Sequence, residues 1–349
     1  MTERKERDIA LICNPAAGGH WRGLADILDS AEASHARRIV TDEIEDITAS
    51  LRKLSDQVKL IVIYGGDGTI LKTINSLYPQ DREEPLMMAL IGGGTMNVSA
   101  RWCGWTGKPS QNFQQVVTMY LEDRLITRDV PMLQVVQGST TQYGFTFGLG
   151  PAIRVLNGYE HNPKSTTTAL IWLAMTVVAA YTGAPADLRQ MTELMPATIT
   201  LDDEVLPFGN FAYVFCNTTG QIVRWVKPFP HERHRETFHT LAYAISRQEG
   251  ILLSPFLARG KIPIDPKSLL KPASDWKRIA LAQVGKDSLP LDPRYINRPA
   301  GKFVVQALDE PIYSIDGDIY PSTGEPITVT LGPSVRMVLS PEAFGLRIA

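Results

Sequence analysis

The sequence predicts an α/β plus β protein, in which an N-terminal Rossmann-like parallel α/β domain precedes a C-terminal antiparallel β-sandwich domain. Two observations support this fold class. Over the first 105 residues or so, short apolar runs alternate with small-residue turns and helical stretches, the pattern of a parallel sheet covered on both faces. After residue 130 or thereabouts, short strand-like runs with frequent turns take over, which is typical of antiparallel sheets.

The first part contains four apolar runs that predict buried strands, at residues 9–13, 38–40, 60–64 and 87–91. Apolar residues at 44, 47, 51 and 54 recur at helical spacing, so a helix is expected over 43–54. A second helix is expected over 70–77. Each predicted strand is followed by a turn or a helix, as the strand–helix–strand units of a parallel sheet require.

The second part predicts strands at 133–136, 143–147, 198–201, 211–215, 303–308 and 327–331, with helical stretches near 166–182 and 235–248. The run Gly148–Pro151 reads as a turn that enters the first helix of this part. The change of pattern places the domain boundary between residues 128 and 129. The second domain then spans 129–349, and the last ~15 residues could pack back on the first domain.

Composition excludes several classes of protein. The 349 residues are 44% hydrophobic and 21% charged, as in a folded chain, and 35 Lys and Arg nearly balance 37 Asp and Glu. Without a basic excess, nucleic acid is not an expected partner. Cys13, Cys103 and Cys216 form no CxxC pair, so neither a disulfide framework nor a thiolate zinc site is expected, which fits the cytosol.

The N-terminus and the apolar segment 169–181 indicate whether the chain spans a membrane or only contacts its surface. The first eight residues carry charges of both signs and show no signal peptide. Residues 169–181 are too few to span a bilayer, which needs ~20 residues. This segment is either a buried helix or a lid over an apolar substrate, so contact with a membrane is expected only at its surface.

Three small-residue turns follow presumed parallel strands, at residues 14–19, 65–69 and 92–97. Open α/β sheets bind ligands at this carboxyl edge. Gly65, Gly66 and Gly68 lack Cβ atoms, so their N–H groups can approach an anion, and the following helix adds a positive dipole end. Asp67 lies within this turn, and a carboxylate beside phosphate suggests Mg²⁺ or a donor hydroxyl nearby.

The turns match neither common nucleotide fingerprint. There is no GxxxxGK[ST] sequence and no complete GxGxxG, so neither a P-loop nor a dinucleotide fold is supported. Any one such turn could be a plain strand-to-helix connection. Three of them on one sheet edge, one carrying an acid, favour a binding site.

Together these turns resemble the diacylglycerol kinase catalytic-domain family, which includes bacterial lipid kinases, sphingosine kinases and ceramide kinases. The resemblance covers about residues 8–101 and lies in Asn14-Pro15-Ala16-Ala17-Gly18, Gly65-Gly66-Asp67-Gly68-Thr69 and Gly94-Thr95-Met96-Asn97. The GGDGT turn is shared with NAD kinases. The NPxxG start and the GTxN turn favour lipid kinases.

The resemblance implies that ATP binds in a cleft between the two domains and that, with Mg²⁺, its γ-phosphate passes to a hydroxyl of a membrane lipid. The lipid would be diacylglycerol or a sphingoid or ceramide-type lipid. Asp67 would act through the metal–phosphate network. The residues expected to bind the nucleotide are Asn14, Thr41, Gly65, Gly66, Asp67, Gly68, Thr69, Gly94, Thr95 and Asn97.

A hairpin near the C-terminus supplies a second acid. Residues 312–320 read as two strands around Asp316-Gly317, a pair suited to a type I′ turn. The family has a DGE element whose last acid acts as catalytic base, and Asp318 resembles it with a side chain one methylene shorter. Asp318 is therefore the expected proton acceptor, assisted by the Asp316 turn, although DG turns also occur as plain hairpins.

Departures from the family pattern leave alternatives open. Lys72 stands where the family usually has Glu. Val98 stands where diacylglycerol kinases usually have Asp, and sphingoid-lipid kinases also lack an acid at that place. With Asp318, they leave open a catalytically weakened, lipid-binding or regulatory homologue. An NAD kinase-like enzyme is the other alternative, although no Asn-Glu pair follows the second glycine turn.

Residues 224–235 mix basic and aromatic side chains, either for membrane docking or as an ordinary loop. A cytoplasmic protein, peripheral at the inner membrane face, is expected.

Overall fold

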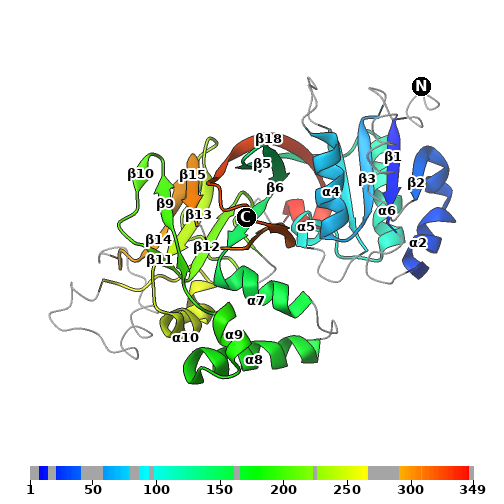
Figure 1. The fold of residues 1–349 in the computed structure, drawn as a ribbon. Helices are drawn as coiled ribbons and strands as arrows, with labels where there is room; N and C mark the ends of the chain where they lie inside the picture. The colour runs from blue at the N-terminus through cyan, green and yellow to red at the C-terminus, as the bar shows by residue number, and fades with distance from the viewer. Residues whose placement is uncertain are drawn as a thin grey trace. The chain divides into compact units, whose positions relative to one another are not determined.

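The computed structural model describes residues 8–14, 21–40, 58–78, 86–93, 98–160, 166–222, 226–265, 291–307 and 309–345. It divides into two compact units (Figure 1). Unit 1 comprises residues 1–132 and 333–349, and unit 2 comprises residues 133–332. The chain passes from one unit to the other within two long strands, β5 (Ile126–Gln137) and β18 (Ile327–Leu339).

Unit 1 is built on a parallel sheet. Its strands are β1 (Ile9–Cys13), β2 (Ala36–Val40), β3 (Leu60–Gly65), β4 (Met87–Gly92) and the end of β18, in the order β18-β4-β3-β1-β2. All four pairings between neighbours are parallel. Every residue of β1 and β3 is buried, because helices cover both faces of such a sheet and leave no polar face.

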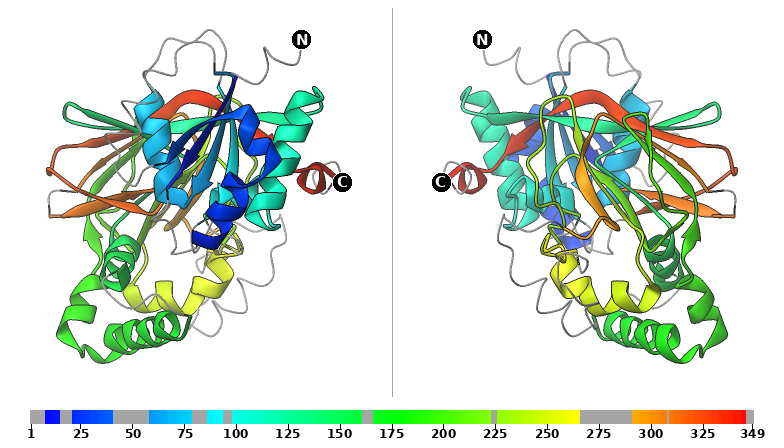
Figure 2. Two further views of the ribbon diagram at one scale, coloured as in Figure 1. Left: turned by 90° about the vertical axis from the view of Figure 1, so that its right-hand side faces the viewer. Right: turned by 90° about the vertical axis from the view of Figure 1, so that its left-hand side faces the viewer.

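The helices of unit 1 lie on the two faces of this sheet. The chain moves across the sheet in one direction from β1 to β2 and in the other from β3 to β4. Right-handed crossovers therefore place α2 (Trp21–Leu28) and α4 (Asp67–Leu77) on opposite faces. Figure 2 shows α4 on one side and α2 with α6 (Pro109–Leu121) on the other. The remaining helices are η1 (Ala31–His35), α5 (Val98–Trp102) and α12 (Pro341–Gly345).

Unit 2 is antiparallel. One sheet has the order β14-β13-β12-β7-β16-β17, and β9, β10, β15 and the start of β18 pair in the order β10-β9-β15-β18. All these pairings are antiparallel. The strands are β6 (Thr140–Gly144), β7 (Thr146–Leu149), β8 (Met195–Pro196), β9 (Thr198–Leu201), β10 (Glu204–Val205), β11 (Asn210–Phe211), β12 (Tyr213–Asn217), β13 (Phe238–Tyr243), β14 (Tyr295–Ala300), β15 (Lys302–Gln306), β16 (Ile312–Ile315) and β17 (Asp318–Pro321).

In the described part of unit 2, the helices that accompany these strands are α7 (Pro151–Glu160), α8 (Thr166–Thr182), α9 (Ala186–Met191) and α10 (Arg247–Leu257). The predicted turn before α7 is confirmed. Gly150 has a left-handed φ of 87° and Pro151 begins the helix, where its missing N–H costs no hydrogen bond. No helix within the described residues has both the length and the apolar character needed to cross a bilayer.

The predicted fold class is confirmed, with one error in an element. Residues 235–248 were expected to be helical, but residues 238–243 form β13 and α10 begins only at Arg247. All six residues of β13 are buried, since it lies between β12 and β14. A short apolar run buried on both sides has no two-residue alternation, so periodicity does not separate it from a buried helix. The predicted helix at 43–54 lies outside the described residues.

The three cysteines are buried and form no disulfide. Burial raises the pKa of the Cys13 thiol to about 12, although the nearby Arg38 charge opposes this. Burial also raises the pKa of Cys216 well above its ordinary value.

Candidate active site

The site in unit 1 lies where the sheet changes its direction of winding. The chain leaves β1 toward one edge of the sheet and leaves β3 toward the other. Open α/β sheets bind their ligands at the carboxyl ends of two strands from which the chain leaves in opposite directions. The first two predicted turns, at Asn14 and at Gly65, begin at these ends.

Asn14 joins the two turns. Its N–H donates to the carbonyl of Tyr64 at 3.1 Å, which extends the ladder between β1 and β3 by one bond. Its side-chain Nδ2 donates to the Thr69 hydroxyl oxygen at 3.1 Å. Thr69 is buried in the first turn of α4. The structure therefore brings together Asn14 and Thr69, two predicted site residues that are 55 positions apart.

Gly65 is required by how closely α4 approaches the end of β3. A Cβ atom at Gly65 would lie 2.7 Å from the Cβ of Thr69 and 2.8 Å from its hydroxyl oxygen. Thr69 is β-branched and cannot move this group away without changing its preferred rotamer. Any side chain at residue 65 would therefore displace Thr69 from Asn14.

The N-terminus of α4 faces the same edge. Gly66 is the N-cap, with extended backbone and no side-chain cap, and the first helical bond runs from the Ile70 N–H to the Gly66 carbonyl at 3.2 Å. The N–H groups of Gly68 and Thr69 precede that bond and have no acceptor within the helix. With the dipole of an 11-residue helix behind them, they form a favourable position for phosphate oxygens.

Asp67 connects this turn to the helix after β4. Its Oδ1 accepts a hydrogen bond from the Ser99 N–H, in the first turn of α5, at 3.1 Å. The Gly93 N–H donates to the Gly65 carbonyl at 2.9 Å. Gly93 lies at the start of the third predicted turn and Ser99 just after its end, so both sides of this turn are attached to the second. A backbone donor has no signature in the sequence, and Ser99 was not among the predicted residues.

Several predicted residues cannot be placed. Thr41, Gly94, Thr95 and Asn97 lie outside the described residues. Lys72 is exposed on α4, and Val98 begins α5.

The hairpin of unit 2 has the predicted form. β16 and β17 pair around Asp316 and Gly317, whose φ angles of 51° and 97° are both positive, as a type I′ turn requires. The carboxylate of Asp316 accepts hydrogen bonds from the Phe145 N–H at 2.9 Å and from the Thr146 N–H at 2.7 Å. Asp316 thus fastens the hairpin to the link between β6 and β7, a structural role that the sequence did not indicate.

We expect Asp316→Asn to lower the free energy of unfolding by about 1.5–3 kcal/mol, because the two N–H donors lose a charged acceptor while the side chain remains tolerant of positive φ. Urea unfolding measures this change. Asp202→Asn is the matched control, since Asp202 also has positive φ (47°) and accepts from two N–H groups, those of Gly301 and Lys302, but at an exposed position. An equal loss in both variants would contradict the structural role of Asp316.

Asp318 begins β17 directly after this turn and is half-buried. Burial, together with the charges of Asp318, Tyr313 and Asp316, raises the pKa of Tyr320. The Tyr320 ring stacks on Tyr313 with 5.6 Å between centroids. Asp318 therefore lies beside a neutral, stacked pair of phenols. Asp318 belongs to unit 2, and Asp67 belongs to unit 1.

Among the described residues, two further features involve none of the predicted site residues. In segment 224–235, Phe229 stacks on His239 with 5.0 Å between centroids, and Arg233 donates to the Thr218 carbonyl at 3.0 Å, so both hold their loop in place. Burial, with the Arg233 and His231 charges, lowers the pKa of His239 to about 4.

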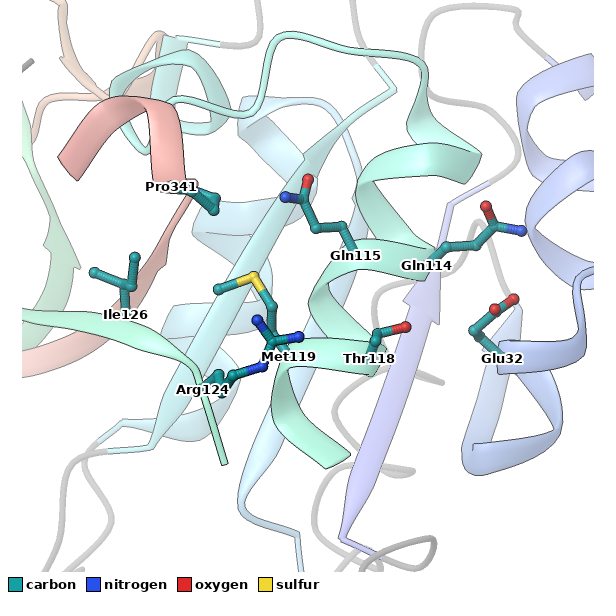
Figure 3. Close-up of a pocket in the computed structure, with 8 residues that line it drawn as sticks. All are labelled: Glu32, Gln114, Gln115, Thr118, Met119, Arg124, Ile126 and Pro341. Carbon is teal, nitrogen blue, oxygen red and sulfur yellow. The ribbon is translucent and has the colours of Figure 1, made fainter. Parts of the chain in front are cut away.

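A hollow of about 680 Å³ lies on unit 1, and no predicted site residue lines it (Figure 3). Its lining is Glu32, Gln114, Gln115, Thr118, Met119, Arg124, Ile126 and Pro341.

Comparison with known proteins bears on the fold and on the class of enzyme. Residues 8–124 match the model of the diacylglycerol kinase catalytic domain. No curated protein matches the sequence. The fold is similar to a solved "putative diacylglycerol kinase" from Bacillus anthracis str. Sterne, with a TM-score of 0.64 at 16% identity over 97% of this chain and 98% of that one. Another structure described in the same words, from the same strain, gives 0.63 at 17% identity over the same shares of the two chains.

At these identities the solved structures establish the fold, and the domain match establishes the class of enzyme. The matched region contains the Asn14 turn, the Gly65–Thr69 turn and the helix α4 that follows it. Residues 8–124 therefore match the model of the diacylglycerol kinase catalytic domain, and the protein is a kinase.

Proposed function

We propose that the protein transfers the γ-phosphate of ATP to a hydroxyl of a membrane lipid, either diacylglycerol or a sphingoid or ceramide-type lipid. The observation that carries this proposal is the junction of β1 and β3. There Asn14, Thr69 and the N-terminus of α4 meet within a region that matches a lipid kinase domain. We further propose a cytoplasmic protein that works peripherally at the inner membrane face.

In this proposal the nucleotide lies at the carboxyl edge of the unit 1 sheet. The N–H groups of Gly68 and Thr69 bind phosphate oxygens, and Gly65 and Gly66 leave room for a close approach. Asn14 holds Thr69 in position. The other proposed nucleotide contacts are Thr41, Asp67, Gly94, Thr95 and Asn97.

The donor set fits magnesium. Asp67 supplies carboxylate oxygen at the N-terminus of α4, and Mg²⁺ prefers oxygen ligands shared with a nucleotide triphosphate. Bound with the nucleotide, the ion neutralises charge on the transferring phosphoryl group. Asp67 keeps one oxygen engaged with the Ser99 N–H, which fixes the direction of the carboxylate.

On the acceptor side, Asp318 takes the proton of the lipid hydroxyl as this oxygen attacks the γ-phosphorus of ATP and ADP leaves. The Asp316 carboxylate holds the hairpin that carries Asp318. Phosphoryl transfer depends mainly on positioning and charge neutralisation, so a fixed hairpin is as important as the acid itself.

Labelled ATP tests this function with four acceptors, namely diacylglycerol, sphingosine, ceramide and NAD. We expect magnesium-dependent labelling of at least one lipid and none of NAD. Labelling of NAD alone would establish the NAD kinase-like alternative. No labelled product from any acceptor, in protein shown to be folded, would leave a lipid-binding or regulatory homologue.

A further inference from the structure

Helix α8 is apolar on both of its faces. Its 17 residues include no Asp, Glu, Lys or Arg. Thr176, Ala179 and Ala180 are buried at helical spacing, while Met175, Val178 and Tyr181 are exposed by 42%, 52% and 52%. A helix on the surface of a soluble protein usually presents polar side chains outward. The outer face of α8 therefore has the apolar composition of a surface that is normally in contact with another apolar surface.

The inner face of α8 is already fixed to unit 2. The Trp172 indole N–H donates to the Val155 carbonyl of α7 at 3.2 Å. A Cβ atom at Gly158 of α7 would lie 2.8 Å from the Trp172 ring, so the two helices are in close contact. Because this face is packed, α8 cannot rotate to bury Met175 and Val178 instead.

Helix α10 extends the apolar face. The Tyr181 hydroxyl donates to the Gln248 carbonyl at 3.3 Å, and the Gln248 amide donates to the Ala180 carbonyl at 3.4 Å. Leu252, one helical turn beyond Gln248, is 37% exposed. Figure 1 shows α8 and α10 near one another in unit 2. We call Met175, Val178, Tyr181 and Leu252 the α8–α10 face.

Two arginines lie next to this face, although the whole chain has a net charge of −2. Arg247 begins α10 next to Gln248. The Arg189 guanidinium lies 3.6 Å from the position of a Cβ at Gly183, just after Tyr181. The two stretches of sequence that carry this face, residues 174–193 and 246–261, contain four basic residues and two acidic ones. This count leaves out Glu249, which is buried and pairs with Arg294. The counted residues are Arg189, Arg247, Arg259 and Lys261 against Asp187 and Glu193.

We propose that the α8–α10 face docks on the surface of a lipid bilayer that contains anionic lipids. This inference rests on the proposed function, because a kinase for a bilayer lipid has to reach its substrate at that surface. Met175, Val178 and Leu252 enter the boundary between headgroups and acyl chains, Tyr181 lies at headgroup level, and the arginines meet anionic headgroups.

A bilayer fits this face better than a second copy of the chain. A stable protein interface buries roughly 800 Å² on each partner, and four partly exposed side chains supply a small part of that area. Interfacial insertion needs only a few apolar side chains when basic residues add attraction to anionic lipid.

Vesicle sedimentation tests the docking. The matched variants are the double substitution Met175→Gln with Val178→Gln and the control Val205→Gln, since Val205 on β10 is 60% exposed but lies outside this face. The vesicles contain phosphatidylcholine, with or without phosphatidylglycerol. We expect the double variant to bind the mixed vesicles at least ~10-fold more weakly and the control to bind as the original protein does.

Arg189→Gln separates the charge contribution from the apolar one. We expect it to weaken binding to the mixed vesicles about 5-fold and to leave binding to phosphatidylcholine alone unchanged. Unchanged binding of the double variant to mixed vesicles would overturn the proposal. So would a dimer in solution that the double variant dissociates, because a second copy would then cover the face.

Activity on a water-soluble short-chain diacylglycerol keeps this inference distinct from the proposed function. We expect the double variant to phosphorylate that substrate as the original protein does, and to lose activity only on lipid in vesicles. If the original protein bound vesicles through this face but phosphorylated no lipid, the function would fail and the surface would stand. If the original protein phosphorylated lipid normally but the double variant bound vesicles equally well, the function would stand and the docking surface would fail.

Discussion

We expect Asp67→Asn to lower kcat at least ~100-fold while the protein stays folded. The amide keeps an oxygen that can accept the hydrogen bond from the Ser99 N–H, which Asp67 accepts at 3.1 Å. What the substitution removes is the negative charge at the N-terminus of α4. If Asp67 acts through magnesium and the phosphates, that charge is what the reaction requires.

Comparison with Asp67→Ala distinguishes chemistry from structure. Alanine loses both the charge and the acceptor for Ser99, so it should lower the thermal unfolding temperature as well as kcat. The measurements are steady-state kinetics over a range of magnesium concentrations and thermal unfolding of both variants. Full activity in Asp67→Asn would show that Asp67 only tethers α5.

Asp318→Asn should also lower kcat at least ~100-fold, and the KM for ATP should change little. The reason is that Asp318 is proposed to act on the lipid hydroxyl, while the nucleotide contacts lie in unit 1. The fold should persist, because the hairpin depends on Asp316, whose carboxylate binds the Phe145 and Thr146 N–H groups.

Asp318→Glu provides the matched control. It keeps the acid and restores the side-chain length that the family usually has at this place, so we expect it to retain activity within about 10-fold of the original. Loss of activity in Asp318→Glu equal to that in Asp318→Asn would mean that the position tolerates only Asp. Unchanged turnover in Asp318→Asn would remove this residue from the mechanism.

The centre of the parallel sheet of unit 1 was predictable because β1, β3 and β4 each have a local signature. The predicted runs at 9–13, 60–64 and 87–91 are apolar throughout and are followed by asparagine or glycine. Burial on both faces removes any polar alternation, and the turn that follows marks the end of each strand. β13 was missed for the same physical reason. It is buried on both faces, His239 and Thr240 included, and without a clear turn beside it, periodicity alone could not identify it.

The candidate site was predictable in its residue types but not in its contacts. Asn14, Gly65 and Asp67 stood out because amide, glycine and carboxylate are unusual at the end of a buried strand. That Asn14 bonds Thr69, that Ser99 donates its N–H to Asp67 and that Asp316 binds backbone could not be predicted. These contacts depend on how distant segments pack, and backbone donors are the same at every residue except proline.

Because Cys13, Cys103 and Cys216 are buried, we expect the folded chain to be unreactive toward thiol reagents. The thiolate is the reactive form, and burial raises the pKa of Cys13 to about 12 and that of Cys216 as well. A cysteine introduced at Val178 would therefore react selectively with a maleimide dye, without prior removal of the native thiols. The emission of that dye would report directly whether the outer face of α8 enters a bilayer.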